Sequence, residues 1–389
     1  MQRYDLLIIN RSFWPIYPII GESLLRLAEN LAFKKKIGVV MQDHANIKKK
    51  LKLFNRGQGV NFFSIWAKSN SSSSIFKRII DSLLFMIWVL ACLIWTRPKK
   101  IYIATDPPVI VPFIVAIYSK LFKANFFYHL QDIHPESANV SIKINYFLFK
   151  LLKKIDVFTI RQANLIFTLN QDMKLEIIKR SKIKKKILIL ENPSIFLDNK
   201  LLKIKKLKGF SFTGNLGRQQ RIPLLLEAIE IYINKGGKLE FNFAGGGVYS
   251  DLIHKLSKSY SSIKYHGIVS AEKAGLIVNN FEWALLPIED KTTKYSFPSK
   301  SSTYACSGSK ILAICGDNTS VSKWVKINQL GFVVPPVVSE LVDTFFKIEK
   351  EKLNEQFINI RREDLKKKLN MDLFVEKLKN LIFPELKNV

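Results

Sequence analysis

The sequence predicts an α/β protein with two doubly wound domains, and three observations indicate this fold. The chain has 389 residues, more than one typical hydrophobic core accommodates. Short apolar strands alternate with amphipathic helices in both halves, which is the pattern of parallel sheets covered on both faces. Turns rich in glycine or proline follow several strands, at the sheet edge where such folds bind ligands.

The domain boundaries follow from composition. We expect a first domain over residues 1–195 and a second over residues 208–350, two Rossmann-like halves facing each other across a cleft. A lysine-rich linker over residues 194–208 separates them. Helices in the remaining segment, 351–389, end the chain and could return to the first domain.

Apolar runs bounded by turn residues mark the expected strands. In the first half they cover residues 1–10, 37–41, 60–65, 101–104, 125–130, 165–169 and 187–190. In the second half they cover residues 209–213, 239–244, 263–265, 283–286, 311–314 and 331–334. The first of these segments lacks a basic leader, a long apolar run and a cleavage site, so we expect no secretory signal.

Residues 295–314 have the character of a ligand-binding turn, with the sequence YSFPSKSSTYACSGSKILAI. Pro298 can open a short helix whose first residues, Ser299 and Lys300, supply a hydroxyl, a cation and free backbone N–H groups. Gly308 then stops the helix before a buried strand. The helix start is therefore expected at the ligand-binding edge of the sheet, where an anion fits.

A second stretch predicts the same kind of ligand. The strand at 209–213 runs into a GNLG turn, and two arginines follow before the next helix. The candidate residues are Gly214, Asn215, Gly217, Arg218 and Arg221. Glycines let the backbone approach a phosphate, and arginines bind its oxygens in pairs. Two helix starts aimed at one crevice favour a diphosphate, although either turn alone is ordinary α/β architecture.

In the first half, the strand at 125–130 leads into the loop QDIHPES. This loop places Asp132, His134 and Glu136 at the carboxyl end of the strand, where they are suited to acid/base chemistry. A purely structural interpretation is that the carboxylates cap nearby backbone N–H groups. The residues alone leave both interpretations open.

Positive charge is concentrated in the first half of the chain. The whole sequence has 61 basic and 32 acidic residues, a formal net charge of +29. Residues 1–190 contain 31 basic and 11 acidic residues, and the remainder contains 30 and 21. Nucleic acid, an anionic membrane surface or a phosphorylated substrate could each be the partner. A lysine-rich composition of the kind found in AT-rich genomes accounts for part of the excess.

The most apolar segment, residues 79–95, is flanked by basic residues on both sides. Its 17 residues fall short of the roughly 20 that a membrane-spanning helix needs, and they include Asp81. An interfacial helix, a buried core helix and a true span are the three interpretations of this segment.

No metal or cofactor is predicted. The three cysteines, Cys92, Cys306 and Cys315, match neither a disulfide framework nor a zinc pattern. None of the five histidines is paired at metal-ligand spacing. We expect the thiols to be small buried hydrophobes in a reducing compartment.

Several motifs, taken together and in order, resemble a known family. From residue 208 onward, FTGNLG, FNFAGGG, IKYHGIVS, WALLPI, FPSKSSTYACSGSKILA and GFVVPP resemble the donor domain of GT-B glycosyltransferases. In the first half, LLIINRSFWP, IATDPP, YHLQDIHPES and LILENP are similar to the acceptor domain of bacterial family 4 enzymes. The subgroup that the chain resembles builds lipid-linked surface polysaccharides and includes N-acetyl-L-fucosamine transferases.

The resemblance implies that a nucleoside diphosphate sugar, UDP-linked, binds the second domain. The residues implied for this donor are Gly214, Asn215, Gly217, Arg218, Arg221, Gly246, Ser299, Lys300 and Thr303. Thr303 stands where related sequences carry a glutamate expected to bind the ribose, which puts nucleotide affinity and donor choice in question. Family membership also implies retention of configuration at the anomeric carbon.

The resemblance assigns catalysis to the first domain. Prepositioned cations and helix dipoles lower the barrier for loss of the diphosphate without a metal. Asp132 would accept the proton of the acceptor hydroxyl or steady the sugar cation, and His134 is the second choice. The loop around Gly21 would meet the acceptor.

We therefore predict a glycosyltransferase that moves a sugar to a polyprenyl-diphosphate-linked glycan in O-antigen or capsule synthesis. We expect the protein at the cytoplasmic face of the inner membrane, peripherally attached, with no cofactor and no nucleic acid. A GT-B-like nucleotide-sugar epimerase is the alternative, because it would use the donor without an acceptor. A basic nucleic-acid-binding module is the weakest hypothesis, because arginines and aromatic residues are not interleaved on one surface run.

Overall fold

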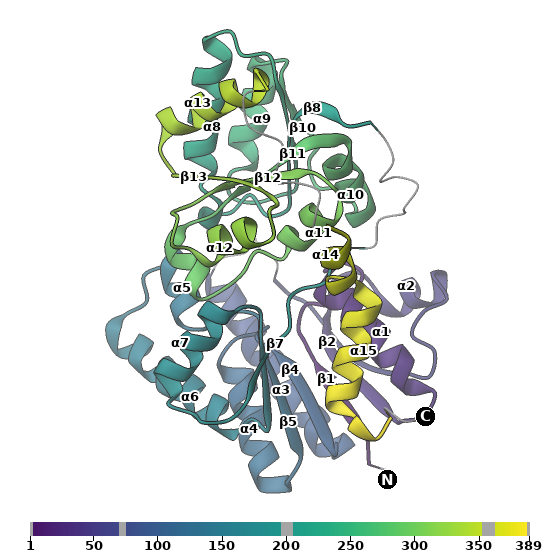
Figure 1. The fold of residues 1–389 in the computed structure, drawn as a ribbon. Helices are drawn as coiled ribbons and strands as arrows, with labels where there is room; N and C mark the ends of the chain where they lie inside the picture. Colours follow the sequence, from purple (N-terminus) through teal and green to yellow (C-terminus); the bar gives the residue numbers. More distant parts are fainter. Residues whose placement is uncertain (1–2, 70–74, 196–204, 352–361, 387–389) are drawn as a thin grey trace. The chain divides into compact units, whose positions relative to one another are not determined.

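The computed structural model describes residues 3–69, 75–195, 205–351 and 362–386 (Figure 1). The chain forms two compact units, the first made of Met1–Asn192 with Met371–Val389 and the second of Pro193–Asn370. Most of the lysine-rich linker and the first half of the helix expected after residue 351 lie outside the described residues. Each unit is a doubly wound α/β domain, which confirms the predicted fold class.

The first unit is built on a seven-stranded parallel sheet with the order β3-β2-β1-β4-β5-β6-β7. Its strands are β1 (Leu6–Ile9), β2 (Ile37–Asp43), β3 (Asn61–Trp66), β4 (Lys100–Ala104), β5 (Asn125–Leu130), β6 (Leu165–Thr168) and β7 (Ile187–Ile189). Its helices are α1 (Ile20–Ala32), α2 (Ile47–Leu53), α3 (Ile75–Thr96), α4 (Ile110–Phe122), α5 (Glu136–Ser141), α6 (Tyr146–Gln162), α7 (Gln171–Ser181) and α15 (Met371–Ile382), followed by the short turn η5 (Pro384–Leu386).

Strand β1 is fully buried, because helices cover both faces of this sheet. Alternate residues of a strand point to opposite faces, and Leu6 and Ile8 enter the core under α1 and α15. Figure 1 shows α1 and α15 against one face and α3 and α4 against the other. This two-sided arrangement follows from right-handed crossovers on both sides of β1, and it explains why the strands read as continuous apolar runs.

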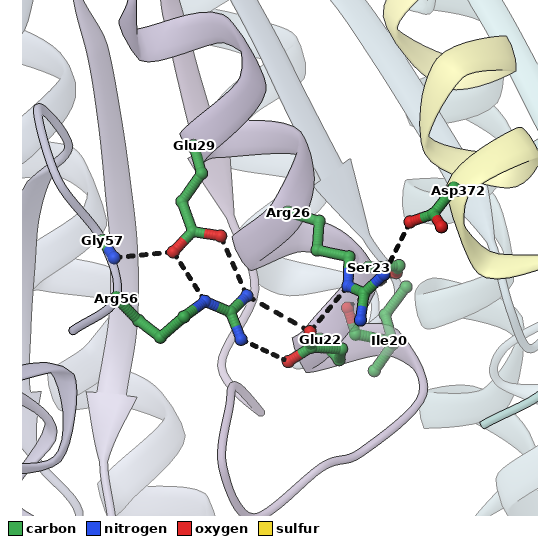
Figure 2. Close-up of polar contacts among 8 residues, drawn as sticks. All are labelled: Ile20, Glu22, Ser23, Arg26, Glu29, Arg56, Gly57 and Asp372. Atoms are coloured by element: carbon green, nitrogen blue, oxygen red, sulfur yellow. Dashed lines mark hydrogen bonds and ion pairs between the residues drawn. The ribbon is translucent and has the colours of Figure 1, made fainter. Parts of the chain in front are cut away.

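A charged network fastens the C-terminal helix α15 to the first unit (Figure 2). Arg26 of α1 binds Glu22, one turn earlier, at 2.7 Å and Asp372 of α15 at 2.6 Å. Arg56 binds Glu29 at 2.8 Å and also reaches Glu22. Beneath these charges, apolar residues of α15 join the core on α1. The last helix therefore belongs to the first unit although it follows the second in sequence.

The second unit repeats the plan with a six-stranded parallel sheet of order β10-β9-β8-β11-β12-β13. Its strands are β8 (Leu207–Thr213), β9 (Glu240–Ala244), β10 (Ile263–Tyr265), β11 (Phe281–Pro287), β12 (Lys310–Ile314) and β13 (Gly331–Val334). Its helices are η2 (Arg218–Gln220), α8 (Ile222–Asn234), α9 (Ser250–Ser259), α10 (Ala271–Asn280), η3 (Asp290–Lys294), α11 (Lys300–Cys306), α12 (Ser320–Ile327), α13 (Val338–Glu349) and α14 (Arg362–Lys368).

In each sheet the first strand has the second strand on one side and the fourth on the other, so the chain winds away from it in opposite directions. This topological switch point opens a crevice at the carboxyl ends of the strands, which is where open α/β sheets bind ligands. In the second unit the switch point lies between β8 and β11, and in the first between β1 and β4. The turns that follow these strands are thus the places to look for a site.

One helix in the described ranges, over Phe76–Thr96 of α3, is long and apolar enough to cross a membrane by length and composition. Only 33% of its apolar window is buried inside the protein. Core helices of soluble proteins pass the same length test, so this observation alone does not decide how α3 is used.

Candidate nucleotide-sugar site

Two glycine turns lie against each other at the carboxyl ends of β8 and β9. The N–H of Gly214 donates to Ala244 O at 2.9 Å, and the N–H of Leu216 donates to Gly246 O at 2.9 Å. Gly245 has φ +134°, and a Cβ at this position would lie 1.8 Å from Gly214 O. Only glycine fits there, because any side chain would collide with the neighbouring backbone. The predicted donor residues Gly214, Gly217 and Gly246 therefore belong to one double turn.

The side chain of Lys300 reaches this double turn. Its Nζ lies 3.7 Å from the position that a Cβ on Gly214 would occupy, and 3.6 Å from the centre of the Phe212 ring. The ammonium is buried and has no hydrogen-bond acceptor among the described residues. Burial lowers the pKa of Lys300 well below its ordinary value of 10.5. An anionic ligand at the turn would supply the missing acceptor and restore the charge.

The other predicted residues of the GNLG turn remain accessible. Asn215 is exposed, and its side chain lies close to Gly217, where a Cβ would come within 2.8 Å of the amide nitrogen. Arg218 begins η2, is exposed, and has no ion-pair partner in the part of the chain that the structure describes. Both side chains are thus available to a ligand at the edge of the sheet.

Arg221 has a different position from the one expected of a phosphate ligand. Its Nε donates to Ile288 O at 2.8 Å, and its Nη2 lies 3.0 Å from Asp290 and 3.2 Å from Glu289. Asp290 also accepts the N–H of Gly316 at 2.9 Å. The guanidinium therefore ties the start of α8 to the ends of β11 and β12. Its role in the structure is to hold turns together, with two carboxylates as partners.

The predicted residues of helix α11 differ in how far they are exposed to solvent. Ser299 is exposed at the N-cap, and its side chain makes no capping hydrogen bond. Thr303 is buried, and its Oγ1 accepts the N–H of Ile195 at 3.3 Å. The Thr303 hydroxyl is thus engaged by the chain itself. The helix has seven residues, so the Lys300 ammonium is a stronger attraction for an anion than the dipole of so short a helix.

Tyr304 is a positioning residue that the sequence did not reveal. Its hydroxyl accepts the N–H of Thr213 at 2.8 Å and donates to Thr213 O at 3.1 Å. Burial raises the pKa of this phenol to about 12, so it stays protonated and can make both bonds. Thr213 immediately precedes Gly214, and Tyr304 thereby fixes the glycine turn to the helix that carries Lys300. An aromatic residue inside a short buried helix was the only signal in the sequence.

Two residues at the end of β10, Tyr265 and Gly267, form hydrogen bonds with the second glycine turn. Tyr265 donates to Gly245 O at 2.8 Å, and the N–H of Gly245 donates to Gly267 O at 2.7 Å. Ile268, which is 85% exposed, lies next to Gly246, where a Cβ would come within 2.9 Å of it. The turn is therefore held both by the residues that end β10 and by the GNLG turn, and the exposed Ile268 side chain lies beside it.

In the first unit, Asp132 and His134 follow β5 as predicted. The N–H of Asp132 donates to Thr105 Oγ1 at 3.1 Å, and its carboxylate accepts a long hydrogen bond of 3.4 Å from Ser137. Burial lowers the pKa of His134, although the nearby Asp132 carboxylate opposes this shift. The histidine is therefore neutral at pH 7, and the carboxylate is the stronger candidate to attract a proton or a positive charge.

Glu136 of the same loop belongs to a buried ion-pair network. Arg180, whose side chain is 1% exposed, binds Glu136 at 2.6 Å and also pairs with Asp156. Arg180 donates in addition to His134 O at 3.0 Å. The network therefore anchors the loop that carries Asp132 to helices α6 and α7. For Glu136 the structure favours the structural interpretation.

Two more groups complete this edge of the first sheet. Asp106 accepts hydrogen bonds from the Arg11 guanidinium at 2.9 Å and from the Ser12 N–H at 2.9 Å. Arg11 balances the charge of Asp106, so this carboxylate is engaged by the chain itself. Gly21 lies in α1, where a Cβ would be 2.4 Å from Trp14 N, and its own N–H donates to Tyr17 O. Glycine is required there for close packing of the loop.

The structure thus brings the predicted residues together in two groups. One, in the second unit, contains Gly214, Asn215, Gly217, Gly246 and Lys300 around one double turn. The other, in the first unit, contains Asp132 and His134 on one loop. Over the described ranges, no three histidine, cysteine or acidic side chains are placed to hold a metal ion.

Comparisons with known proteins agree with this fold. No family model matches the chain. The protein named "probable glycosyltransferase WbjE" of Pseudomonas aeruginosa is 21% identical over 273 residues, which cover 65% of this chain and 68% of that protein.

Solved structures with a similar fold cover nearly the whole chain. The structure of HepE from Anabaena in complex with UDP has a TM-score of 0.66 at 13% identity, over 98% of this chain and 100% of that one. WaaG, a glycosyltransferase involved in lipopolysaccharide biosynthesis, has 0.65 at 10%, over 97% and 99%. A Listeria monocytogenes protein assigned as UDP-N-acetylglucosamine 2-epimerase has 0.62 at 10%, over 100% and 98%. The chain has the GT-B fold that these proteins share.

Proposed function

We propose that this protein is a glycosyltransferase that takes a sugar from a UDP-linked donor. The observation that carries the proposal is the Lys300 ammonium, which is buried beside the Gly214 turn without an acceptor among the described residues. A buried cation in this state is costly unless a ligand pairs with it. The diphosphate of a sugar nucleotide would provide that partner, and the relatives named glycosyltransferase or solved with UDP support this choice.

The chemistry follows from the charge that develops during sugar transfer. The bond between the anomeric carbon and the diphosphate oxygen breaks, so negative charge grows on the leaving diphosphate while the sugar becomes cationic. Lys300 and the exposed Arg218 would stabilise that leaving group, and Asn215 would orient it. The glycine turns would let the phosphates approach the backbone. Arg221, through its bonds to Asp290 and Ile288, would keep the start of α8 in place against the ends of β11 and β12.

Asp132 is proposed to act on the acceptor side of the reaction. Its carboxylate would accept the proton of the attacking hydroxyl or steady the sugar cation, and neutral His134 would assist by hydrogen bonding. Arg180 and Glu136 would hold the loop rigid. The family resemblance adds that configuration at the anomeric carbon is retained.

The proposed acceptor is a polyprenyl-diphosphate-linked glycan in surface polysaccharide synthesis, used at the cytoplasmic face of the inner membrane. The support comes from the family resemblance, from the basic first half of the chain and from WaaG, whose name links this fold to lipopolysaccharide biosynthesis. Gly21 and the loop packed on it would lie where the acceptor enters.

A panel of nucleotide sugars tests the proposal through thermal stabilisation, because a ligand that binds only the folded state raises its melting temperature. We expect UDP and at least one UDP-sugar to stabilise the wild type. Lys300→Met should abolish this stabilisation and Arg218→Ala should weaken it, while both variants remain folded. Lys291→Met, which removes an exposed lysine of η3, should behave as the wild type. Equal stabilisation of all variants would refute the assigned site.

A nucleotide-sugar epimerase is the second candidate, favoured by the shared fold of the Listeria protein. An epimerase would convert the donor alone, without a lipid fraction. Incubating each stabilising UDP-sugar with and without membrane lipid extract therefore separates the two reactions. Product that forms only with the extract and carries the sugar on lipid supports the transferase.

A further inference from the structure

Three helices on one side of the first sheet expose many large apolar side chains. Helix α3 packs against α4, and α4 packs against α6, so the three form a continuous layer. Along α3 the exposed residues include Phe76, Ile79, Leu83, Ile87, Leu90 and Ile94. Leu121 and Phe122 of α4 and Phe147 and Leu151 of α6 are exposed as well. We call this layer the apolar helix face.

Helix α3 has two distinct sides. The exposed residues follow one another at intervals of three or four, which places them on one stripe. Phe85, Val89 and Cys92 are spaced in the same way and are fully or almost fully buried. Trp88 adds a hydrogen bond from its indole N–H to Phe63 O of β3 at 3.1 Å. The helix is thus fixed to the sheet by one side and presents the other to its surroundings.

Asp81, the one acidic residue of α3, is accommodated by hydrogen bonds on the docked side of the helix. Its side chain belongs to the docked side, is 1% exposed, and accepts hydrogen bonds from Gln42 at 2.9 Å and from the Ser69 hydroxyl at 2.6 Å. The N–H groups of Lys68 and Ser69 also donate to it. A helix that crossed a bilayer would lose these partners and bring the carboxylate into hydrocarbon. The network therefore holds α3 along the sheet.

The exposed charges of the apolar helix face are all positive. The three helices contain two acidic residues, Asp81 and Asp156, and each is 1% exposed. Their exposed charged residues are lysines and arginines, such as Lys77, Arg78 and Lys120. A bilayer with anionic lipids matches both the apolar stripe and the cations, as in helices that lie in the membrane interface. The charge pattern thus favours an anionic bilayer as the occupant.

We propose that the apolar helix face docks on an anionic lipid bilayer, with α3 lying in the interface rather than crossing the membrane. This docking rests on the proposed function, because an enzyme with a lipid-linked acceptor must work at the bilayer. The side chains of α3 would enter the boundary between head groups and acyl chains, and the lysines and arginines would contact the head groups. Residues of the second unit are not needed for this contact.

Vesicle flotation tests the docking with the full chain. We expect the wild type to float with phosphatidylcholine vesicles that contain phosphatidylglycerol, and to bind pure phosphatidylcholine much more weakly. The triple variant Ile79→Glu/Leu83→Glu/Ile87→Glu should bind anionic vesicles roughly 100-fold more weakly, since three half-exposed aliphatic side chains leave the interface. The matched control Val248→Glu/Ile268→Glu/Ile327→Glu changes three exposed residues of the second unit and should float as the wild type does.

The outcomes separate this inference from the proposed function. Lys300→Met should lose UDP binding and still float, whereas the triple variant should keep UDP stabilisation and fail to float. Undiminished flotation of the triple variant would overturn the docking face. Resistance of the vesicle-bound wild type to extraction at high pH would overturn the flat orientation, because an interfacial helix is released. A wild-type dimer that the triple variant converts to monomer would instead assign the face to a second copy of the chain.

Discussion

The two units share the order of their first six strands and differ in the side chains that they expose to solvent. In the second unit the helices are amphipathic, and among their described residues only Leu252 and Ile327 are exposed large hydrophobics. Its glycine turns leave backbone groups at the edge of the sheet, beside the Lys300 ammonium, which has no hydrogen-bond acceptor among the described residues. In the first unit the corresponding edge is filled by the chain's own ion pairs, and the outer helices are apolar. The same fold can therefore serve a phosphate ligand in one unit and a lipid surface in the other.

The largest expected effect concerns the ion pairs of the first unit. Arg180→Met leaves Asp156 buried without this cation and leaves Glu136 with the partly exposed Lys153 at 3.0 Å, so we expect a loss of about 3–5 kcal/mol in the free energy of unfolding. Urea denaturation measures this loss. Lys179→Met, its exposed neighbour in α7, should change stability by less than about 0.5 kcal/mol. Similar losses of stability in Arg180→Met and Lys179→Met would contradict the view that ion pairs stabilise this edge of the first sheet.

Two cations of the second unit should respond with opposite signs. Lys300→Met removes a buried ammonium without an acceptor among the described residues, so stability should rise by about 1–3 kcal/mol. Arg221→Met breaks bonds to Asp290, Glu289 and Ile288 O, so stability should fall by roughly 1–2 kcal/mol. Thermal unfolding of both variants without ligand gives the signs. A stability loss in Lys300→Met would contradict an unpaired charge.

A smaller effect is expected from the link between helix α11 and the glycine turn. Tyr304→Phe removes the bonds to both backbone groups of Thr213, which should lower stability by about 1–2 kcal/mol. UDP affinity should fall several-fold, because the turn is no longer held against Lys300. Calorimetric titration with UDP measures the second effect. Tyr260→Phe at the end of α9 is the matched control and should leave UDP affinity unchanged.

The smallest effect is a change in proton binding. The folded pKa of Lys300 lies below the unfolded value of 10.5, so the unfolded state holds more protons between the two pKa values. Stability should therefore rise with pH across that window. Below the folded pKa of Lys300, burial of the charged ammonium should lower the free energy of unfolding by its full amount. When the diphosphate restores the ammonium, binding in that window should take up a proton.

Calorimetry in buffers of different ionisation enthalpy detects this uptake. Lys300→Met should show none. Arg218→Ala should retain it at whatever reduced affinity remains, because Lys300 is intact in this variant. Equal proton uptake by the wild type and Lys300→Met would place the titrating group elsewhere.

Much of the fold could be predicted from local patterns. The strands expected at 37–41, 125–130 and 311–314 appear as Ile37–Asp43, Asn125–Leu130 and Lys310–Ile314. Each is an apolar run bounded by turn residues, and such runs form strands wherever they are buried on both faces. The glycine turns were predictable for the same reason, because the need for close backbone approach is visible in the residue type.

The partners of the charged residues could not be predicted in this way. Arg221 reaches Asp290, and Asp81 reaches Gln42 and Ser69, through contacts that depend on which strands become neighbours. The sequence offered both Arg221 and Lys300 as phosphate ligands. In the structure their surroundings differ, because the Arg221 guanidinium binds carboxylates and the Lys300 ammonium lies over the Phe212 ring.

The sequence by itself determined the elements, their alternation and the excess of positive charge in the first half, because these depend on local periodicity and composition. Only the tertiary structure decided which cation lacks a hydrogen-bond acceptor among the described residues and which side of α3 faces outward. Ion pairing and burial depend on distances between residues far apart in the chain, and the packing of the sheets sets those distances.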